Sequence, residues 1–107
     1  MSTDEATVFL VDDDDAVRDA LGLLLDSVGL RTASYPSAAA FLEQYDPGCP
    51  GCLVLDIRMP AMSGMELQAA LAEKSVNIPI IFLSGHGNVS MSARAFRSGA
   101  VDFLEKP

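Results

Sequence analysis

Aspartates follow two apolar stretches of this 107-residue sequence, at the point where each stretch ends. Asp56 ends the run 52–56, and Asp12 and Asp13 follow the run 7–11. Short apolar runs of this kind are typical of buried parallel strands. An aspartate has no packing reason to end a strand that is buried on both faces, whereas open α/β sheets bind ligands beyond the carboxyl ends of their strands. We therefore interpret Asp56 as a functional residue.

The three aspartates together predict a cation site. In the common doubly wound order the first strand lies beside the third, so Asp12, Asp13 and Asp56 become neighbours. Clustered carboxylates repel one another unless a cation neutralises them. Oxygen ligands from one or two carboxylates, with room for water, suit Mg²⁺ rather than zinc. The pattern therefore favours magnesium.

Two further strand ends supply a hydroxyl and a cation. Ser84 follows the apolar run 80–83, and Lys106 follows the run 101–104. A lysine and a hydroxyl opposite a metal-bound carboxylate suit a phosphoryl group, because the cations neutralise its oxygens and the hydroxyl donates a hydrogen bond. A carboxylate can act as the nucleophile and form an aspartyl-phosphate. This edge of the sheet therefore predicts phosphoryl chemistry at Asp56.

Capping residues place the helices that separate these strands. An aspartate within 13–15 is expected to begin a helix that Gly29 ends, and Asp14 and Asp15 are interpreted as caps only. Ser63 and Glu66 fit the capping box Ser-x-x-Glu and predict another helix. The two other expected helices are one that Ser37 caps, over 38–44, and one that begins at Asn88 or Ser90 and stops at Ser98-Gly99.

Apolar runs place five strands, at 7–11, 30–35, 52–56, 80–83 and 101–104. Five strands alternating with four helices predict an α/β fold: a doubly wound parallel sheet in the flavodoxin-like order 2-1-3-4-5. No helical pattern follows the last strand, so we expect a single domain over 1–107, truncated before its fifth helix. The missing cover is expected to leave apolar side chains of the first helix and of the first and central strands in water, and the patch to be hidden by self-association or by rearranged packing.

Composition and charge narrow the class of protein. Half of the residues are apolar, and the formal net charge is −8. The negative charge argues against direct binding of nucleic acid by this segment, because such binding requires basic patches. The apolar runs are too short for a membrane span and no basic leader begins the sequence, so a cytoplasmic location is expected.

The pair Cys49 and Cys52 precedes a strand and has no second pair, so we interpret both cysteines as structural.

In order and spacing, these motifs resemble the receiver domain of two-component response regulators, and in particular the FixJ-like, LuxR-type transcription regulators. The motifs that carry the resemblance are VDD at 11–13, GCLV at 51–54, LDIRMP at 55–60, SG at 63–64, SGHG at 84–87 and AVDFLEKP at 100–107. The resemblance implies that Asp56 is the phosphoacceptor. It also implies that Asp13, Asp56 and the backbone carbonyl of Arg58 bind Mg²⁺, and that Asp12 acts through a metal-bound water.

The resemblance further implies a switch and its partners. Lys106 would contact the phosphate and be joined to Pro107 by a cis peptide, and Ser84 and Phe103 would be the switch pair. The implied function is a phosphorylation-dependent signal receiver, which catalyses only its own phosphorylation and dephosphorylation. The implied partners are a sensor histidine kinase, a second copy on phosphorylation, and DNA only through an output domain beyond residue 107.

Two other classes of protein share parts of the pattern. A Mg²⁺-dependent phosphatase with an aspartyl nucleophile also places Asp-x-Asp after a strand, but here Arg58 stands at the second position after Asp56, so a general acid is lacking. A flavodoxin-like electron carrier would need a phosphate-binding run of Ser, Thr and Gly after the first strand, and none is present. Phosphomonoester turnover and flavin absorbance distinguish these alternatives.

Overall fold

The computed structural model describes residues 6–85, 97 and 99–105. The elements in this part of the chain are β1 (Thr7–Val11), α1 (Asp15–Ser27), β2 (Arg31–Tyr35), α2 (Ala38–Gln44), β3 (Gly51–Asp56), α3 (Gly64–Glu73), β4 (Ile80–Ser84) and β5 (Asp102–Glu105). The strands form one parallel sheet in the order β2-β1-β3-β4-β5. The predicted fold class and strand order are confirmed.

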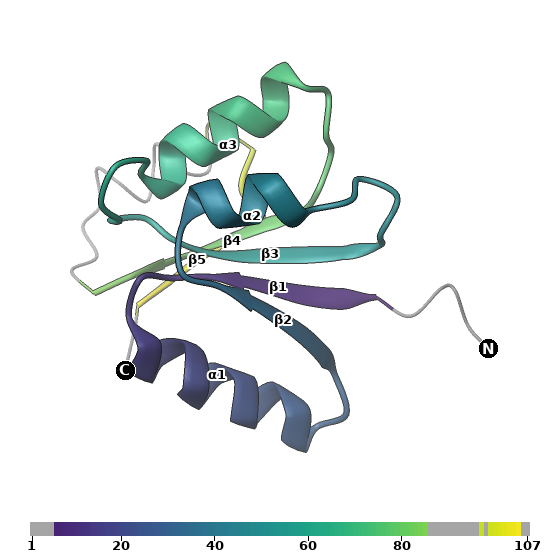
Figure 1. Cartoon of the computed structure of the whole chain (residues 1–107), viewed down its shortest axis with the longest axis vertical. Coiled ribbons are helices and arrows are strands. Elements are labelled where there is room, and N and C mark those ends of the chain that lie inside the picture. Colours follow the sequence, from purple (N-terminus) through teal and green to yellow (C-terminus); the bar gives the residue numbers. More distant parts are fainter. Residues whose placement is uncertain (1–5, 86–96, 98, 106–107) are drawn as a thin grey trace.

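The sheet lies between two helical layers. Figure 1 shows α1 on one side of the sheet and α2 and α3 on the other, as right-handed crossovers between parallel strands require when the strand order reverses at β1. Most of the helix predicted from Asn88 or Ser90 lies outside the described residues, as does the 106–107 segment. Arg97 is helical, and Gly99 has a φ of +98°, which favours glycine. No helix in the described part of the chain has the length and apolar character needed to cross a bilayer.

The core fills the space between the sheet and the layer of α2 and α3. Alternate residues of a strand face opposite sides of the sheet, and Phe9 and Val11 of β1 belong to the same buried cluster as Phe41 of α2 and Leu67 of α3. The ring of Phe41 is fully buried and packs edge-on against Phe9, with 5.8 Å between ring centroids. These contacts hold α2 against β1, which lies between β2 and the central strand β3.

Side-chain caps begin the helices where the sequence predicts them. Asp14 is the N-cap of α1, and Ser37 is the N-cap of α2. Ser63 and Glu66 form the complete capping box of α3, each side chain accepting a hydrogen bond from the other residue's backbone N–H. Gly29 follows α1 with a φ of +84°, which is typical of the residue after a helix C-terminus.

Helix α1 covers its side of the sheet only in part. None of its residues is buried, and the predicted apolar patch on this helix is confirmed. The large exposed apolar side chains among the described residues are Leu23, Leu24, Val28, Leu30, Val101 and Leu104. The expectation that β1 is left in water is wrong for Leu10, which is 1% exposed; β1 lies between β2 and β3, and α1 contacts it. In the central strand β3, Val54 is partly buried, so its side chain is only partly in water.

Candidate metal centre at the carboxyl edge of the sheet

Three carboxylates meet at the carboxyl edge of the sheet. One oxygen from each of Asp12, Asp13 and Asp56 lies within 4.8 Å of the other two. Asp12 and Asp56 are 2% and 3% exposed, whereas Asp13 is open to solvent. The structure therefore brings the three predicted aspartates together, with two of them buried and one at the surface.

The register of the two central strands accounts for this meeting. β1 and β3 are parallel, and Val11 of β1 pairs with Leu55 of β3. The next residue of each strand, Asp12 or Asp56, therefore lies beside its counterpart and points to the same side of the sheet. Asp13 follows at the start of the loop to α1.

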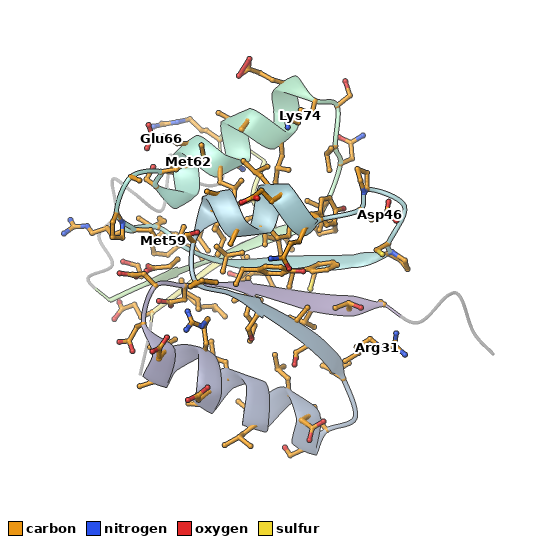
Figure 2. The ribbon with its side chains drawn as sticks, viewed as in Figure 1. Arg31, Asp46, Met59, Met62, Glu66 and Lys74 are labelled. Atoms are coloured by element: carbon orange, nitrogen blue, oxygen red, sulfur yellow. The ribbon has the colours of Figure 1, made fainter. Side chains whose placement is uncertain are left out.

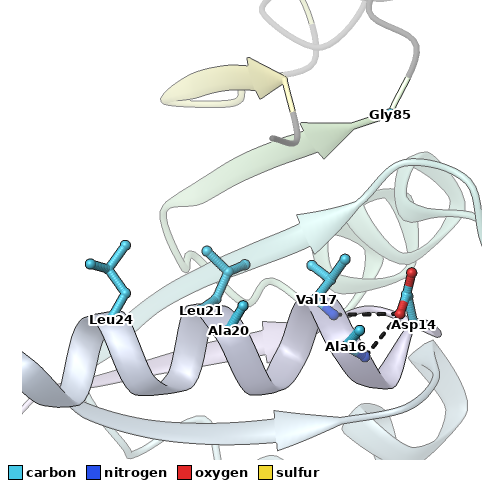
Figure 3. A pocket seen from close by; sticks show the side chains of 7 residues that line it. All are labelled: Asp14, Ala16, Val17, Ala20, Leu21, Leu24 and Gly85. Carbon is cyan, nitrogen blue, oxygen red and sulfur yellow. Dashed lines mark hydrogen bonds between the residues drawn. The ribbon is translucent and has the colours of Figure 1, made fainter.

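Hydrogen bonds donated by backbone N–H groups hold the loop from β1 to α1. The N–H of Asp12 donates to the carbonyl of Tyr35 on β2, 3.2 Å away. The Asp12 carboxylate accepts from the N–H of Asp14 at 2.9 Å. The Asp14 carboxylate in turn caps α1 by accepting from the N–H groups of Ala16 and Val17, at 2.9 and 3.4 Å (Figure 3).

Arg18 also contacts this loop, a role that was not predicted from the sequence. Its guanidinium donates to the backbone carbonyl of Asp12, 2.8 Å away, and pairs with the carboxylate of Asp15. The available signal is an arginine three residues after an aspartate in a helix, because such residues lie on the same face. That signal indicates an ordinary surface ion pair, and nothing in the spacing points to the carbonyl of Asp12.

The loop after Asp56 is closed by a tight contact with α3. The N–H of Gly64 donates to the carbonyl of Ile57 at 2.9 Å. A Cβ at position 64 would lie 2.4 Å from the carbonyl oxygen of Asp56, so only glycine fits without a shift of backbone. The Asp56 carboxylate accepts from the N–H of Arg58 at 3.3 Å, and Arg58 itself is exposed.

The other predicted site residues lie on the neighbouring strands. Asp56 pairs with Leu83 in the register of β3 and β4, so Ser84 follows directly beside it, 2% exposed. Phe103 of β5 is partly buried and packs against the core cluster. Lys106 falls outside the described residues, so its predicted contact with a phosphate, like the cis peptide to Pro107, stays a prediction.

The three carboxylates fit a hard divalent cation. Octahedral Mg²⁺ with ligands at 2.0–2.1 Å separates adjacent ligand atoms by about 3 Å and opposite ones by about 4.2 Å. The spacing of the three oxygens is compatible with that geometry. The exposure of Asp13 leaves one side of the site open to water, which Mg²⁺ keeps as ligands.

The cysteine pair does not form a second centre. Both thiols are free, with Cys49 exposed and Cys52 partly buried. Burial raises the pKa of the Cys52 thiol, and a raised pKa lowers the fraction of reactive thiolate. For Cys52, this agrees with the interpretation as a structural residue.

A hollow of about 420 Å³ lies between α1 and the end of β4. Figure 3 shows the side chains of α1 that line it, among them Val17, Leu21 and Leu24, with Gly85 on the opposite side. Asp14 is the charged residue of the lining, and its carboxylate is used by the helix cap. The hollow therefore offers mainly apolar contact.

The chain matches the response regulator receiver domain family over residues 8–107. It is 49% identical over 107 residues to the response regulator protein TmoT of Ectopseudomonas mendocina, covering all of this chain and 49% of that protein. It is 47% identical over 100 residues to the transcriptional regulatory protein FixJ of Azorhizobium caulinodans, covering 94% of this chain and 47% of that protein. The chain thus spans about half the length of these relatives.

Solved structures give the same result. The response regulator StyR superposes with a TM-score of 0.89 at 50% identity, over 96% of this chain and 52% of that one. FixJ-N superposes with a TM-score of 0.87 at 44% identity, over 100% of this chain and 84% of that one.

Proposed function

This chain belongs to the response regulator receiver domain family, and on that premise we propose that Asp56 accepts a phosphoryl group from a sensor histidine kinase. The observation that carries the proposal is the position of Asp56. It ends the central strand β3, is 3% exposed, and has a carboxylate oxygen within 4.8 Å of oxygens of Asp12 and Asp13.

The transfer step needs a nucleophile and charge neutralisation. An oxygen of the Asp56 carboxylate attacks phosphorus and forms the acyl-phosphate bond, while the bond from phosphorus to the imidazole nitrogen of the donor histidine breaks. Asp13 and Asp56, with the carbonyl of Arg58, would hold Mg²⁺, and Asp12 would act through a bound water. When bound, the metal neutralises the phosphoryl oxygens. Lys106 would supply a second positive charge.

We place the switch at Ser84 and Phe103. Ser84 lies directly beyond the residue that pairs with Asp56 and is buried at the same edge of the sheet, so we assign its hydroxyl to the phosphoryl group that Asp56 would carry. Phe103 pairs with Phe82 on the neighbouring strand and is only partly buried, which leaves it room to change its exposure. Added negative charge at Asp56 would therefore be read out at the surface of β5.

The proposed output is transcription. The relative FixJ is named as a transcriptional regulatory protein, and this chain spans about half of its length. We propose an output domain beyond residue 107 that binds DNA, released when two phosphorylated copies associate. The negative charge of this segment, −8, is consistent with leaving DNA contacts to another domain.

Intact-mass spectrometry after incubation with acetyl phosphate and Mg²⁺ tests the phosphoacceptor. The chain is expected to gain one phosphoryl group, Asp56→Asn to gain none, and omission of Mg²⁺ to slow the reaction. Asp46→Asn is the matched control, because Asp46 is an exposed turn residue at the opposite edge of the sheet (Figure 2). Unchanged labelling of Asp56→Asn would refute the assignment, and sustained turnover of a phosphomonoester would indicate the phosphatase.

A further inference from the structure

Arg18 joins the helix α1 to the backbone of the carboxylate cluster. Its side chain is 14% exposed, whereas that of its ion-pair partner Asp15 is 85% exposed. The guanidinium therefore lies against the protein, and Asp15 approaches it from solvent. Its second contact is the 2.8 Å hydrogen bond to the backbone carbonyl of Asp12.

The carbonyl of Asp12 belongs to the peptide group that links Asp12 to Asp13. Because a peptide group is planar, a hydrogen bond that fixes the carbonyl also fixes the N–H and the Cα of the following residue. The direction in which the Asp13 side chain leaves the backbone then depends only on rotation about the bond between its N and Cα. Asp13 is exposed, so little packing is available to hold it otherwise.

We propose that Arg18 is a positioning residue for the cation site. Its guanidinium holds the peptide between Asp12 and Asp13, so that the Asp13 carboxylate stays beside Asp12 and Asp56 before a cation arrives. The inference rests on the proposed function, because it takes these carboxylates as the place where Mg²⁺ binds. Groups that orient metal ligands without touching the metal commonly change metal affinity tenfold or more.

Charge and position predict opposite effects of removing Arg18. A positive charge close to a cation site repels the cation, so its removal alone would tighten Mg²⁺ binding. Asp15 pairs with the guanidinium and offsets part of that charge. Loss of the hydrogen bond, by contrast, frees the Asp13 carboxylate and weakens Mg²⁺ binding. The sign of the change therefore distinguishes the two effects.

The test is a titration with MgCl2 in the absence of any phosphoryl donor, followed by the backbone amide NMR signals of the site. Arg18→Met is expected to weaken Mg²⁺ binding about tenfold and to shift the Asp13 amide signal in metal-free buffer. Arg18→Lys keeps one donor group and the charge, so a smaller loss is expected. Arg31→Met is the matched control, since Arg31 is exposed and lies at the amino end of β2, away from the site (Figure 2).

Two further outcomes decide between position, charge and general stability. Asp15→Asn keeps the bond to the carbonyl, so Mg²⁺ affinity is expected to change less than threefold and in a salt-dependent way. A loss as large as that of Arg18→Met would show that charge balance controls the site and would overturn the inference. Unchanged or tighter binding by folded Arg18→Met would overturn it too, and if that variant does not fold, Arg18→Ala, which also removes the donor, decides by the same criterion.

The inference and the proposed function fail in different ways. A wild-type chain that binds Mg²⁺ but takes up no phosphoryl group would refute the proposed function and leave the role of Arg18 standing. A wild-type chain that does both, with a Mg²⁺ affinity indifferent to Arg18→Met, would refute the role of Arg18 alone. Absence of Mg²⁺ binding by the wild type would refute both.

Discussion

The carboxylate of Asp12 accepts a hydrogen bond from the backbone N–H of Asp14, 2.9 Å away. One residue of this pair belongs to the candidate cation site, and the other is the N-cap of α1. The four consecutive aspartates thus have two different tasks. Asp12 and Asp13 face Asp56, whereas Asp14 and Asp15 serve the start of the helix and the guanidinium of Arg18.

Replacing Asp13 should separate metal binding from folding. Asp13→Ala is expected to lose most Mg²⁺ affinity, about tenfold or more, because it removes one of three clustered carboxylates. Its melting temperature in metal-free buffer should be unchanged or slightly higher, because the carboxylates repel one another. Calorimetric titration and thermal melting measure the two quantities, with Asp19→Ala, an exposed aspartate of α1, as the control. A clear drop in the melting temperature of Asp13→Ala would instead identify Asp13 as a structural cap.

Position 64 should tolerate no side chain. Gly64→Ala would place a Cβ 2.4 Å from the carbonyl oxygen of Asp56 and 3.0 Å from the Cα of Ile57. Such overpacking typically costs about 1–3 kcal/mol in the free energy of unfolding. Gly22→Ala is the matched control, because nothing lies within 4 Å of its Cβ position in α1. Alanine there should stabilise the folded protein by up to about 1 kcal/mol. Urea unfolding of both variants checks the prediction, and equal stability of Gly64→Ala and the wild type would contradict it.

The apolar surface of α1 should make the 107-residue chain associate with itself. Leu24 is 61% exposed and lines the hollow between α1 and β4, whereas Leu23 is 73% exposed and does not line it. Leu24→Gln is expected to reduce association clearly, and Leu23→Gln to reduce it less, with stability changing by only about 0.5 kcal/mol in each. Light scattering over a range of concentrations measures the association. A wild-type chain that stays monomeric throughout would refute the prediction.

The sequence predicts the carboxylate cluster because local signals are sufficient there. Apolar runs that end in Asp12 and Asp56, with the usual order of a doubly wound sheet, place these residues side by side, and the register of Val11 with Leu55 does so in the structure. The caps Asp14 and Ser63 are local in the same sense, because each side chain bonds the backbone two or three residues later.

Contacts between elements are the part that the sequence does not predict. The spacing of Arg18 from Asp15 predicts only a surface ion pair. Its hydrogen bond to the Asp12 carbonyl depends on how α1 is oriented relative to the sheet. The need for glycine at position 64 arises only where α3 meets the end of β3. β5 begins at Asp102, one residue later than predicted, because pairing with Ile81 rather than apolar character sets where that strand begins.

The order β2-β1-β3 also determines when the site comes into existence during synthesis. Asp12 and Asp13 leave the ribosome well before Asp56, and until β3 is made, the only strand available to β1 is β2. The third carboxylate joins the others only through this pairing of distant segments, which forms late compared with local contacts. Gly64 must then follow to close the loop behind Asp56. A nascent chain that has not reached α3 therefore lacks the complete site proposed for phosphoryl transfer, and we expect it not to respond to the proposed kinase.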